Sequence, residues 1–477
     1  MTIKVVDVFA GPGGLNEGFA SYSVDGKRPF SISLSIEKER VACGTLTARA
    51  ALRTVQAEIG PLPPSYLSAI RTGTLASLEQ DTLFGPAMVS ARRHVREFTL
   101  DAATRPDSDA LISSAVSGTD PWVLIGGPPC QLYSLVGRAR ASRLPGFEDD
   151  VRHVLYKEYL HILETHRPDA FVMENVKGML SAMHKDGRIF DLIREDIAGA
   201  GYELRSLVVD SGDLSPSDFV VRSNEYGVPQ KRHRVILLGV RNDLSSAPRS
   251  ALTPSHEVHV RTAIGGLPAI RSRISPFKRD DFETWIGLRD IGLKVADREE
   301  PFELVANRLG GRFVSAPVAM PGKSRYEQFV VRPRMRGFAQ HEARGHMDSD
   351  ISRYAFYSQK MLSGEKWKVN DLPLSLVPNH RNVGRPNTPF TDRFRVQAWD
   401  DQSSTVVSHI SKDGHYFIHP DPLQARSLTV REAARLQSFP DDYVFCGNRT
   451  EQYHQVGNAV PPLLAQGVAE VVHGLFD

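Results

Sequence analysis

The N-terminus of the chain combines a strand, a glycine-rich turn and a helix in direct succession. The apolar run from Ile3 to Phe9 stops at Ala10-Gly11-Pro12-Gly13-Gly14, and apolar residues then recur at roughly helical spacing through residues 15–22. A second apolar alternation, Ile32 to Ile36, ends at Glu37. Strands that alternate with helices predict an α/β fold with a parallel, doubly wound sheet.

The same order recurs at Pro121 to Ile125, Ala170 to Met173 and Val235 to Val240, where short apolar runs lead into polar loops. Residues 45–119 show no clear pattern, and we treat them as an insertion or helical cover of unknown role. From about Asn242 the composition shifts towards Arg, Pro and Ser. We therefore expect a catalytic domain at 1–241, completed by 449–477, and a smaller, irregular domain at 242–448.

Composition limits the classes of protein to consider. At roughly 150 residues per domain, 477 residues predict two or three domains. The charges, 58 Lys and Arg against 56 Asp and Glu, leave +2, so any nucleic-acid site must be a local patch. Three cysteines exclude a disulfide framework and a cysteine-rich zinc module, and we expect no metal. No apolar run approaches the ~20 residues that cross a bilayer, which favours a cytoplasmic protein.

Four features at the expected carboxyl edge of the sheet carry chemistry, and each has a plain alternative. The glycine-rich turn with Glu37 fits a nucleoside cofactor about as well as a structural turn. Cys130, held by the stiff loop Gly126-Gly127-Pro128-Pro129, is a candidate nucleophile or a small buried hydrophobe. Glu174 is a candidate proton donor or a surface acid. Arg232 and Arg234 form a clamp for an anion or carbonyl, or a solvated strand entry.

A resemblance emerges from the order of these motifs. They are Asp7-Val8-Phe9-Ala10-Gly11-Pro12-Gly13-Gly14, Pro128-Pro129-Cys130-Gln131, Glu174-Asn175-Val176, Gln230-Lys231-Arg232-His233-Arg234 and Gly457-Asn458-Ala459-Val460-Pro461-Pro462. The set resembles the ordered motif series of the DNA cytosine-5 methyltransferases. Residues Arg426 to Gln437 resemble the family's segment between the target-recognition region and the last helix. The resemblance covers nearly the whole chain.

The resemblance implies a Rossmann-like sheet and a reaction at carbon 5 of a flipped-out cytosine. Cys130 would add to carbon 6, because a thiolate is nucleophilic near neutral pH and leaves again afterwards. Glu174 would bond N3 and the exocyclic amine, and Arg234 would bond O2. Asn175 would hold the Cys130 loop, and Arg232 would brace the loop or a phosphate.

The cofactor implied is S-adenosyl-L-methionine, with S-adenosyl-L-homocysteine as product. The residues expected at its site are Phe9, Ala10, Gly11, Gly13, Gly14, Leu15, Glu37, Pro128, Asn458 and Val460. Phe9 would stack on the adenine and Glu37 would bind the ribose. The family's acid at the adenine is harder to place, and Asp101 is one guess.

The macromolecular partner implied is double-stranded DNA. The resemblance also implies a monomeric protein of the restriction-modification type, with a cognate restriction endonuclease that acts separately. The residues expected to contact DNA are Gln131, Ser134, Arg138, Arg140, Arg332, Arg334 and Arg336. Leu132-Tyr133-Ser134 departs from the usual family residues after the cysteine, although Tyr133 keeps an aromatic ring there. The setting would be a bacterial cytoplasm, with action at the nucleoid.

Two other functions remain open from the sequence. An RNA cytosine-5 methyltransferase would carry a similar motif set, but the large Arg-rich domain at 242–448 favours DNA. A non-catalytic DNA-binding regulator is disfavoured, because Cys130, Glu174 and Arg234 are all present.

Overall fold

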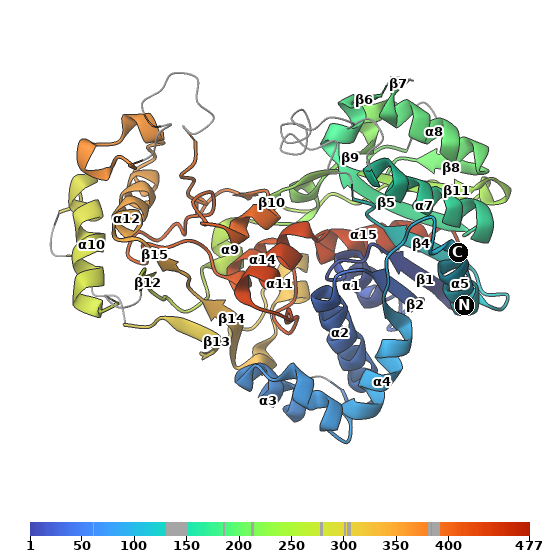
Figure 1. Cartoon of the computed structure of the whole chain (residues 1–477), viewed down its shortest axis with the longest axis horizontal. Coiled ribbons are helices and arrows are strands. Elements are labelled where there is room, and N and C mark those ends of the chain that lie inside the picture. The colour runs from blue at the N-terminus through green and yellow to red at the C-terminus, as the bar shows by residue number, and fades with distance from the viewer. Residues whose placement is uncertain are drawn as a thin grey trace.

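A computed structural model describes the protein at residues 1–60, 62–129, 151–184, 187–210, 214–276, 280–299, 302, 307–379, 383 and 392–477, without the side chains of residues 151–154 and 184. One large sheet with helices on both faces occupies one side of the molecule, and a smaller part with short strands and two long helices, α10 and α12, extends from it (Figure 1). Within the described residues, no helix is long and apolar enough to cross a membrane.

The main sheet has the strand order β3-β2-β1-β4-β5-β11-β8, and β9 pairs with β11. Its strands are β1 (Ile3–Val8), β2 (Phe30–Glu37), β3 (Val95–Glu97), β4 (Trp122–Gly126), β5 (Ala170–Val176), β8 (Tyr202–Arg205), β9 (Val220–Arg222) and β11 (His233–Arg241). The pairs from β3 to β5 are all parallel, which confirms the sequence prediction for this half of the sheet.

Strand β11 departs from the predicted parallel arrangement. It runs antiparallel to β5, β8 and β9. The physical reason lies in the connection: β9 leads into β11 through the short turn η5 (Ser223–Tyr226) and β10 (Gln230–Lys231). A parallel neighbour needs a crossover of a dozen or more residues, usually a helix, and none is present here.

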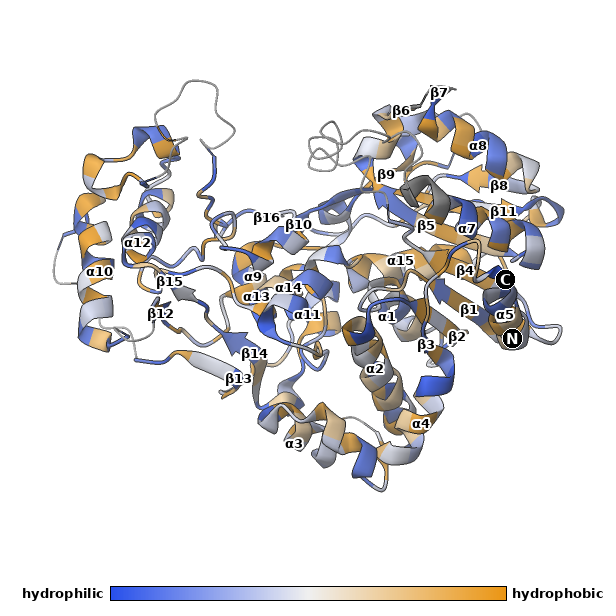
Figure 2. Ribbon diagram, in the orientation of Figure 1, coloured by the Kyte–Doolittle hydropathy of each residue, from blue (hydrophilic) through white to orange (hydrophobic). Residues whose placement is uncertain are grey.

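The two faces of the sheet carry different helices. Ile3 and Val5 of β1 join a core with α1 (Gly14–Ser21) and α15 (Pro462–His473), whereas Val6 and Val8 join a second core on the opposite face. That second core includes residues of α5 (Arg105–Val116), α7 (Val151–His166) and α8 (Ile189–Gly199). Because both faces are covered, the central strands read as apolar runs in the sequence. In Figure 2, apolar and polar residues alternate along the covering helix α8, as a one-sided contact requires.

The stretch at 45–119, which the sequence left without a role, is mostly helical. Up to residue 94 it contains most of α2 (Arg40–Ile59), then α3 (Pro64–Thr72), η1 (Leu75–Gln80) and α4 (Phe84–His94), whereas β3 and α5 further on belong to the main sheet and its covering helices. Helices α2 to α4 enclose an apolar cluster of their own, to which Met335 and Ala339 of the second part also belong. These helices therefore pack between the two parts of the molecule and help to hold them together.

The second part is irregular and built from short elements. Its strands pair two by two, β12 (Arg273–Ile274) with β15 (Gly345–His346) and β13 (Gly310–Ser315) with β14 (Gly337–Glu342). Its helices and turns are α9 (Val260–Ile264), α10 (Phe282–Val295), α11 (Arg325–Val330), η8 (Pro333–Met335), α12 (Asp348–Leu362), η9 (Val369–Asp371), η10 (Leu374–Leu376), η11 (Ser408–Ser411) and α13 (Val430–Leu436). Strand β16 (Ser403–Ser404) of the second part pairs with β10 of the main part, and this pairing connects the two parts.

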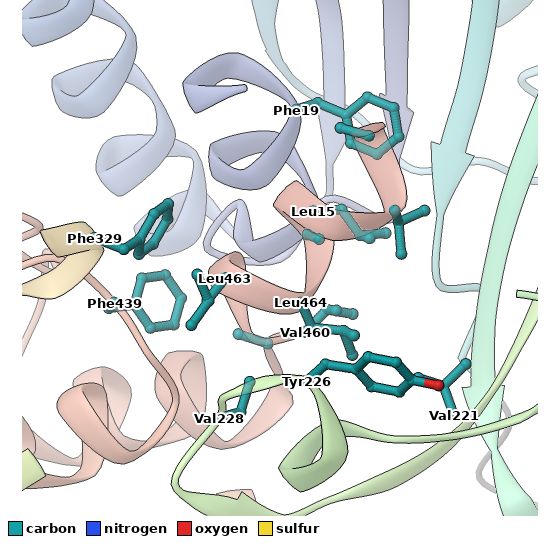
Figure 3. Close-up of a cluster of buried hydrophobic side chains, with 14 of the residues drawn as sticks. Leu15, Phe19, Val221, Tyr226, Val228, Phe329, Phe439, Val460, Leu463 and Leu464 are labelled. Atoms are coloured by element: carbon teal, nitrogen blue, oxygen red, sulfur yellow. The ribbon is translucent and has the colours of Figure 1, made fainter. Parts of the chain in front are cut away.

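The remaining elements are short or C-terminal: η3 (Lys177–Ser181), the pair β6 (Met183–His184) and β7 (Gly187–Arg188), η4 (Pro216–Phe219), η6 (Asn242–Leu244) and α14 (Arg449–Asn458). Figure 3 shows how the C-terminal segment enters the core: Val460, Leu463 and Leu464 lie among Leu15 of α1 and Tyr226 of η5. Phe329 and Phe439 of the second part join the same cluster. One continuous core thus unites both ends of the chain with the second part.

A chain of buried charges fixes α1 and α2 to this core. Arg49 donates to both carboxyl oxygens of Glu17 and lies 3.3 Å from Asp442, and Arg53 adds a second cation at Glu17. Burial raises the pKa of Glu17, but Arg49 and Arg53 outweigh burial and lower it overall. Each of these buried side chains therefore has an oppositely charged side chain beside it.

Asp7, in the same region, is a buried carboxyl with a different environment. It is 1% exposed, and neither of its oxygens accepts a well-aligned hydrogen bond from the described residues. Burial, with a smaller contribution from the negative charge of Glu37, raises the pKa of Asp7 to about 8, against the lowering effect of the nearby Asn16 amide and of Arg53. At neutral pH the folded protein therefore holds Asp7 mainly in its neutral form.

We expect Gly18→Ala to destabilise the protein by about 1–3 kcal/mol, since added bulk strains a packed interior. A Cβ on Gly18 would lie 2.3 Å from Ala465 Cβ of α15. Gly199→Ala is the matched control: no atom lies within 4 Å of its Cβ position, so the expected effect is no loss, or a gain of at most about 1 kcal/mol. Urea denaturation measures both, and equal stability of the two variants would contradict the close packing of α1 on α15.

We expect Asp7→Asn to change the pH dependence of stability. Asp7 has a folded pKa of about 8 against an ordinary value of 3.8, so between these values the folded state binds the extra proton. Its stabilising contribution is complete at low pH and is lost as pH rises towards 8. Asparagine does not titrate, so the free energy of unfolding of the variant, minus that of the wild type, should increase from about pH 4 to about pH 8. A difference that stays constant over this range would refute the assignment.

Candidate active site

The loop between β1 and α1 is shaped by backbone geometry and by Glu37. Gly11 and Gly13 have φ angles of 54° and 88°, in the region where only glycine is free of strain, and Phe9 also adopts a φ of 54°. Glu37 accepts hydrogen bonds from the amides of Gly11 and Glu39, each at 2.8 Å. A carboxylate has about four acceptor positions, so Glu37 can still bind two hydroxyl groups.

The C-terminal segment closes over this loop. The carbonyl oxygen of Val460 lies 2.1 Å from where a Cβ of Gly14 would be, so glycine is required there. Tyr443 donates a hydrogen bond to the carbonyl of Pro12. Asn458, at the end of α14, is exposed. The structure thus brings together the loop and the C-terminal residues that the sequence placed at one cofactor site.

Strands β1, β4 and β5 lie side by side at this edge, where β1 and β4 end and β5 continues to Val176. Val8 of β1 pairs with Gly126 of β4, and Gly126 pairs with Met173 of β5. Phe9, Gly127 and Glu174 are the next residues of these strands, so the two loops and the carboxylate emerge together. This confirms that the topology places Glu174 beside the loop that leads to Cys130.

Glu174 and Arg234 form an ion pair, with Glu174 Oε1 and Arg234 Nε 2.8 Å apart. Both side chains are partly accessible, 13% and 16% exposed, and Oε1 accepts no well-aligned hydrogen bond in the described part of the chain. Glycine at position 127 leaves room for the carboxylate, because a Cβ added at this position would lie 3.0 Å from Glu174 Oε2. The pair therefore offers an acceptor and a donor to a planar polar ligand.

Asn175 and Arg232 brace the surrounding loops. Asn175 donates to the carbonyl of Pro128 at 3.5 Å, which ties β5 to the loop before Cys130. Arg232 is 2% exposed and donates to the carbonyls of Val406 and Gly457. Burial, with a contribution from Arg234, lowers the pKa of Arg232 to about 9. Its contacts match the bracing role considered from the sequence rather than a contact with substrate.

Two glutamines form a polar junction that the sequence analysis did not single out. Gln230 accepts from the amide of Val406 and donates to Gln437, and Gln437 donates to the carbonyls of Val456 and Ala459 on either side of Asn458. Both side chains are fully buried. Gln230 and Gln437 stand within the quoted motifs, so the signal was present, but their pairing is visible only in three dimensions.

The expected DNA-contacting residues fall into two groups. In the first group, Gln131, Ser134, Arg138 and Arg140 lie outside the described residues, as does Cys130, the expected nucleophile. In the second group, Arg334 and Arg336 are exposed on either side of the buried Met335, whereas Arg332 donates to the carbonyls of Gln328 and Val331 and lies 3.8 Å from Asp442. The guess for the adenine acid, Asp101, accepts from the amides of Ala103 and Thr104. In the described ranges, no cluster of His, Cys, Asp and Glu is arranged to hold a metal.

Comparison with known proteins assigns the family. The model of the C-5 cytosine-specific DNA methylase family matches residues 107–286 and 323–473. The type II methyltransferase M.Bpa9945I of Bacillus paralicheniformis is 34% identical, over 98% of this chain and 99% of its own length. The type II methyltransferase M.AgeI of Thalassovita gelatinovora is 26% identical, over 98% and 99%. A solved prophage-encoded protein of Escherichia coli, described as a DNA modification methyltransferase, has the same fold with a TM-score of 0.57 at 19% identity, covering 100% and 99% of the two chains.

These matches and the arrangement of the motifs around one sheet edge agree with each other. The chain belongs to the C-5 cytosine-specific DNA methylase family, whose members methylate carbon 5 of cytosine in DNA.

Proposed function

We propose that this chain methylates a specific cytosine in double-stranded DNA with S-adenosyl-L-methionine, through a covalent adduct on Cys130. The observation that carries the proposal is the register of β1, β4 and β5, which brings the glycine-rich loop, the loop towards Cys130 and Glu174 side by side. A methyl donor held by the glycine-rich loop and a base held by Glu174 would meet at this edge of the sheet.

The residues around the glycine-rich loop fit the cofactor. Gly11 and Gly13 leave the backbone accessible, and Glu37 keeps acceptor positions for the two ribose hydroxyls. Phe9 would stack on the adenine, and Ala10, Gly14, Leu15, Pro128, Asn458 and Val460 would line the site. When bound, S-adenosyl-L-methionine supplies an electrophilic methyl group, and S-adenosyl-L-homocysteine is left as product.

The chain's own residues would carry out the activation of the base. The Cys130 thiolate forms a bond to carbon 6, which makes carbon 5 nucleophilic enough to take the methyl group. Glu174 holds N3 and the exocyclic amine, and Arg234, already ion-paired with Glu174, donates to O2. Carbon 5 then releases its proton to water, the bond from carbon 6 to sulfur breaks, and the thiolate is restored.

Asn175 and Arg232 would act as positioning residues, since both bond backbone carbonyls of the loops that border the site. Residues 1–241 with 449–477 would perform catalysis, and 242–448 would recognise the target sequence. The residues that would contact DNA are Gln131, Ser134, Arg138, Arg140, Arg334 and Arg336. Arg332 would support the turn that carries Arg334 and Arg336.

The biological setting is also a proposal. Two relatives are named type II methyltransferases, which supports action on DNA within a restriction-modification system. We propose that the chain acts as a monomer in a bacterial cytoplasm, with a separate restriction endonuclease as the cognate enzyme.

We expect Cys130→Ala to abolish methylation and Glu174→Gln to slow it by about 10²–10⁴-fold, the usual contribution of a general acid. The measurement is transfer of label from S-adenosyl-L-methionine to matched DNA and tRNA, followed by mapping of 5-methylcytosine in host DNA. Label in tRNA alone would favour an RNA enzyme. Unchanged methylation by Cys130→Ala would contradict the covalent mechanism.

We expect Glu37→Gln to weaken binding of S-adenosyl-L-homocysteine by about 10- to 100-fold, because hydrogen bonds to a charged group contribute about 1.5–3 kcal/mol. Glu39→Gln is the matched control, since Glu39 is 70% exposed and neighbours Glu37. Isothermal calorimetry measures both affinities. Equal affinities for the two variants would remove Glu37 from the cofactor site.

A further inference from the structure

Three basic residues lie next to one another at the sheet edge that carries Glu174. Arg222 of β9 pairs with His233 of β11, and cross-strand partners project to the same face of a sheet. Val176 of β5 pairs with Arg234, and Lys177 follows Val176 directly. The row Arg222, His233 and Lys177 therefore extends from β9 across β11 to the residue that follows β5. Neighbouring residues of a strand project to opposite faces, so the row lies on the face of the sheet opposite to Arg234 and Glu174.

The row is a region of positive potential. Burial lowers the pKa of His233, and the charges of Arg222 and Lys177 lower it further, so both charges lie close to the imidazole. Arg234 acts in the same direction, and Glu225 is the acid that opposes them. Glu225 lies 3.2 Å from Arg222, but this pair is solvent-exposed, at 43% and 59%, and such pairs contribute little. Lys177 is exposed as well.

The position of the row identifies the chemistry of its ligand. A cytosine held by Glu174 and Arg234 must leave the duplex by rotation of its backbone, which places the adjoining phosphates at the mouth of the base site. Lys177 is three residues beyond Glu174, and His233 adjoins Arg234, so the row lies at the same edge as the base site but on the opposite face of the sheet. Lysine offers a point charge to a phosphate, arginine a two-pronged donor and neutral histidine one N–H.

We propose that Lys177, Arg222 and His233 bind the phosphodiester backbone next to the flipped cytosine and so hold the target strand while the base occupies its site. This inference rests on the proposed function, since it presupposes a base at Glu174. Contacts of this kind position the nucleic acid without reading its sequence.

The test is the salt dependence of DNA binding by Lys177→Ala, Arg222→Ala and the double variant. The duplex comes from DNA that the wild-type chain methylates, with affinity measured between 50 and 200 mM salt, a range over which about 6–10 phosphate contacts change affinity by 10³–10⁵-fold. Each lost contact should reduce the slope of log affinity against log salt by about 0.9 and weaken binding about fivefold at 0.15 M salt. The double variant should bind roughly 30-fold more weakly.

Arg92→Ala is the matched control. Arg92 of α4 is 50% exposed and pairs with one exposed acid, Glu79, as Arg222 does with Glu225. Its slope should equal that of the wild type. The row variants should keep wild-type affinity for S-adenosyl-L-homocysteine and a wild-type single-turnover rate at saturating DNA, with the change confined to KM.

The outcomes separate the two proposals. Normal wild-type methylation with an unchanged salt slope in the double variant would overturn the phosphate row alone. A lower single-turnover rate at saturating DNA would also overturn it, because a backbone contact would then not be the role of these residues. If the wild-type chain methylates no DNA, the proposed function is wrong, and the inference that the row binds phosphates is wrong as well.

Discussion

The contact between the carbonyl of Val460 and Gly14 is the constraint on which the site depends. A side chain at position 14 would place its Cβ 2.1 Å from that oxygen, so the C-terminal segment and the start of α1 can meet only across a glycine. The contact joins opposite ends of the chain. Because Val460, Leu463 and Leu464 are also buried in the core, the segment that closes over the glycine-rich loop is itself part of the interior of the fold.

The glutamine junction extends this constraint from the glycine-rich loop to the segment that carries Arg234. Gln437 is bonded on either side of Asn458, and Gln230 lies on the segment that leads to Arg234. A buried amide is costly unless its hydrogen bonds are made, so the junction permits essentially one arrangement of these segments. The positions of Asn458 and Arg234 are therefore interdependent, although neither residue contacts the other in the described hydrogen bonds.

Buried charges perform a similar task between the helices and the second part. Arg49 links Glu17 of α1 to Asp442, and Arg332 lies near the same Asp442. Removing one partner of such a set leaves an uncompensated charge in the interior, which is far more costly than losing an exposed pair. The insertion at 45–119 thus has a structural function: its helices supply Arg49 and the apolar cluster that receives Met335.

The sequence by itself determined the local elements and the identity of the chemical groups. Apolar periodicity predicted β1, β2, β4 and β5, because hydrophobic spacing reports local conformation directly. Motif order predicted the family. Only the tertiary structure decided the reversed direction of β11, the loop contacts of Arg232, the burial that keeps Asp7 uncharged, and the row formed by Arg222, His233 and Lys177. Each of these depends on which strand or helix lies alongside, and pairing between residues distant in sequence leaves no periodic signal in the chain.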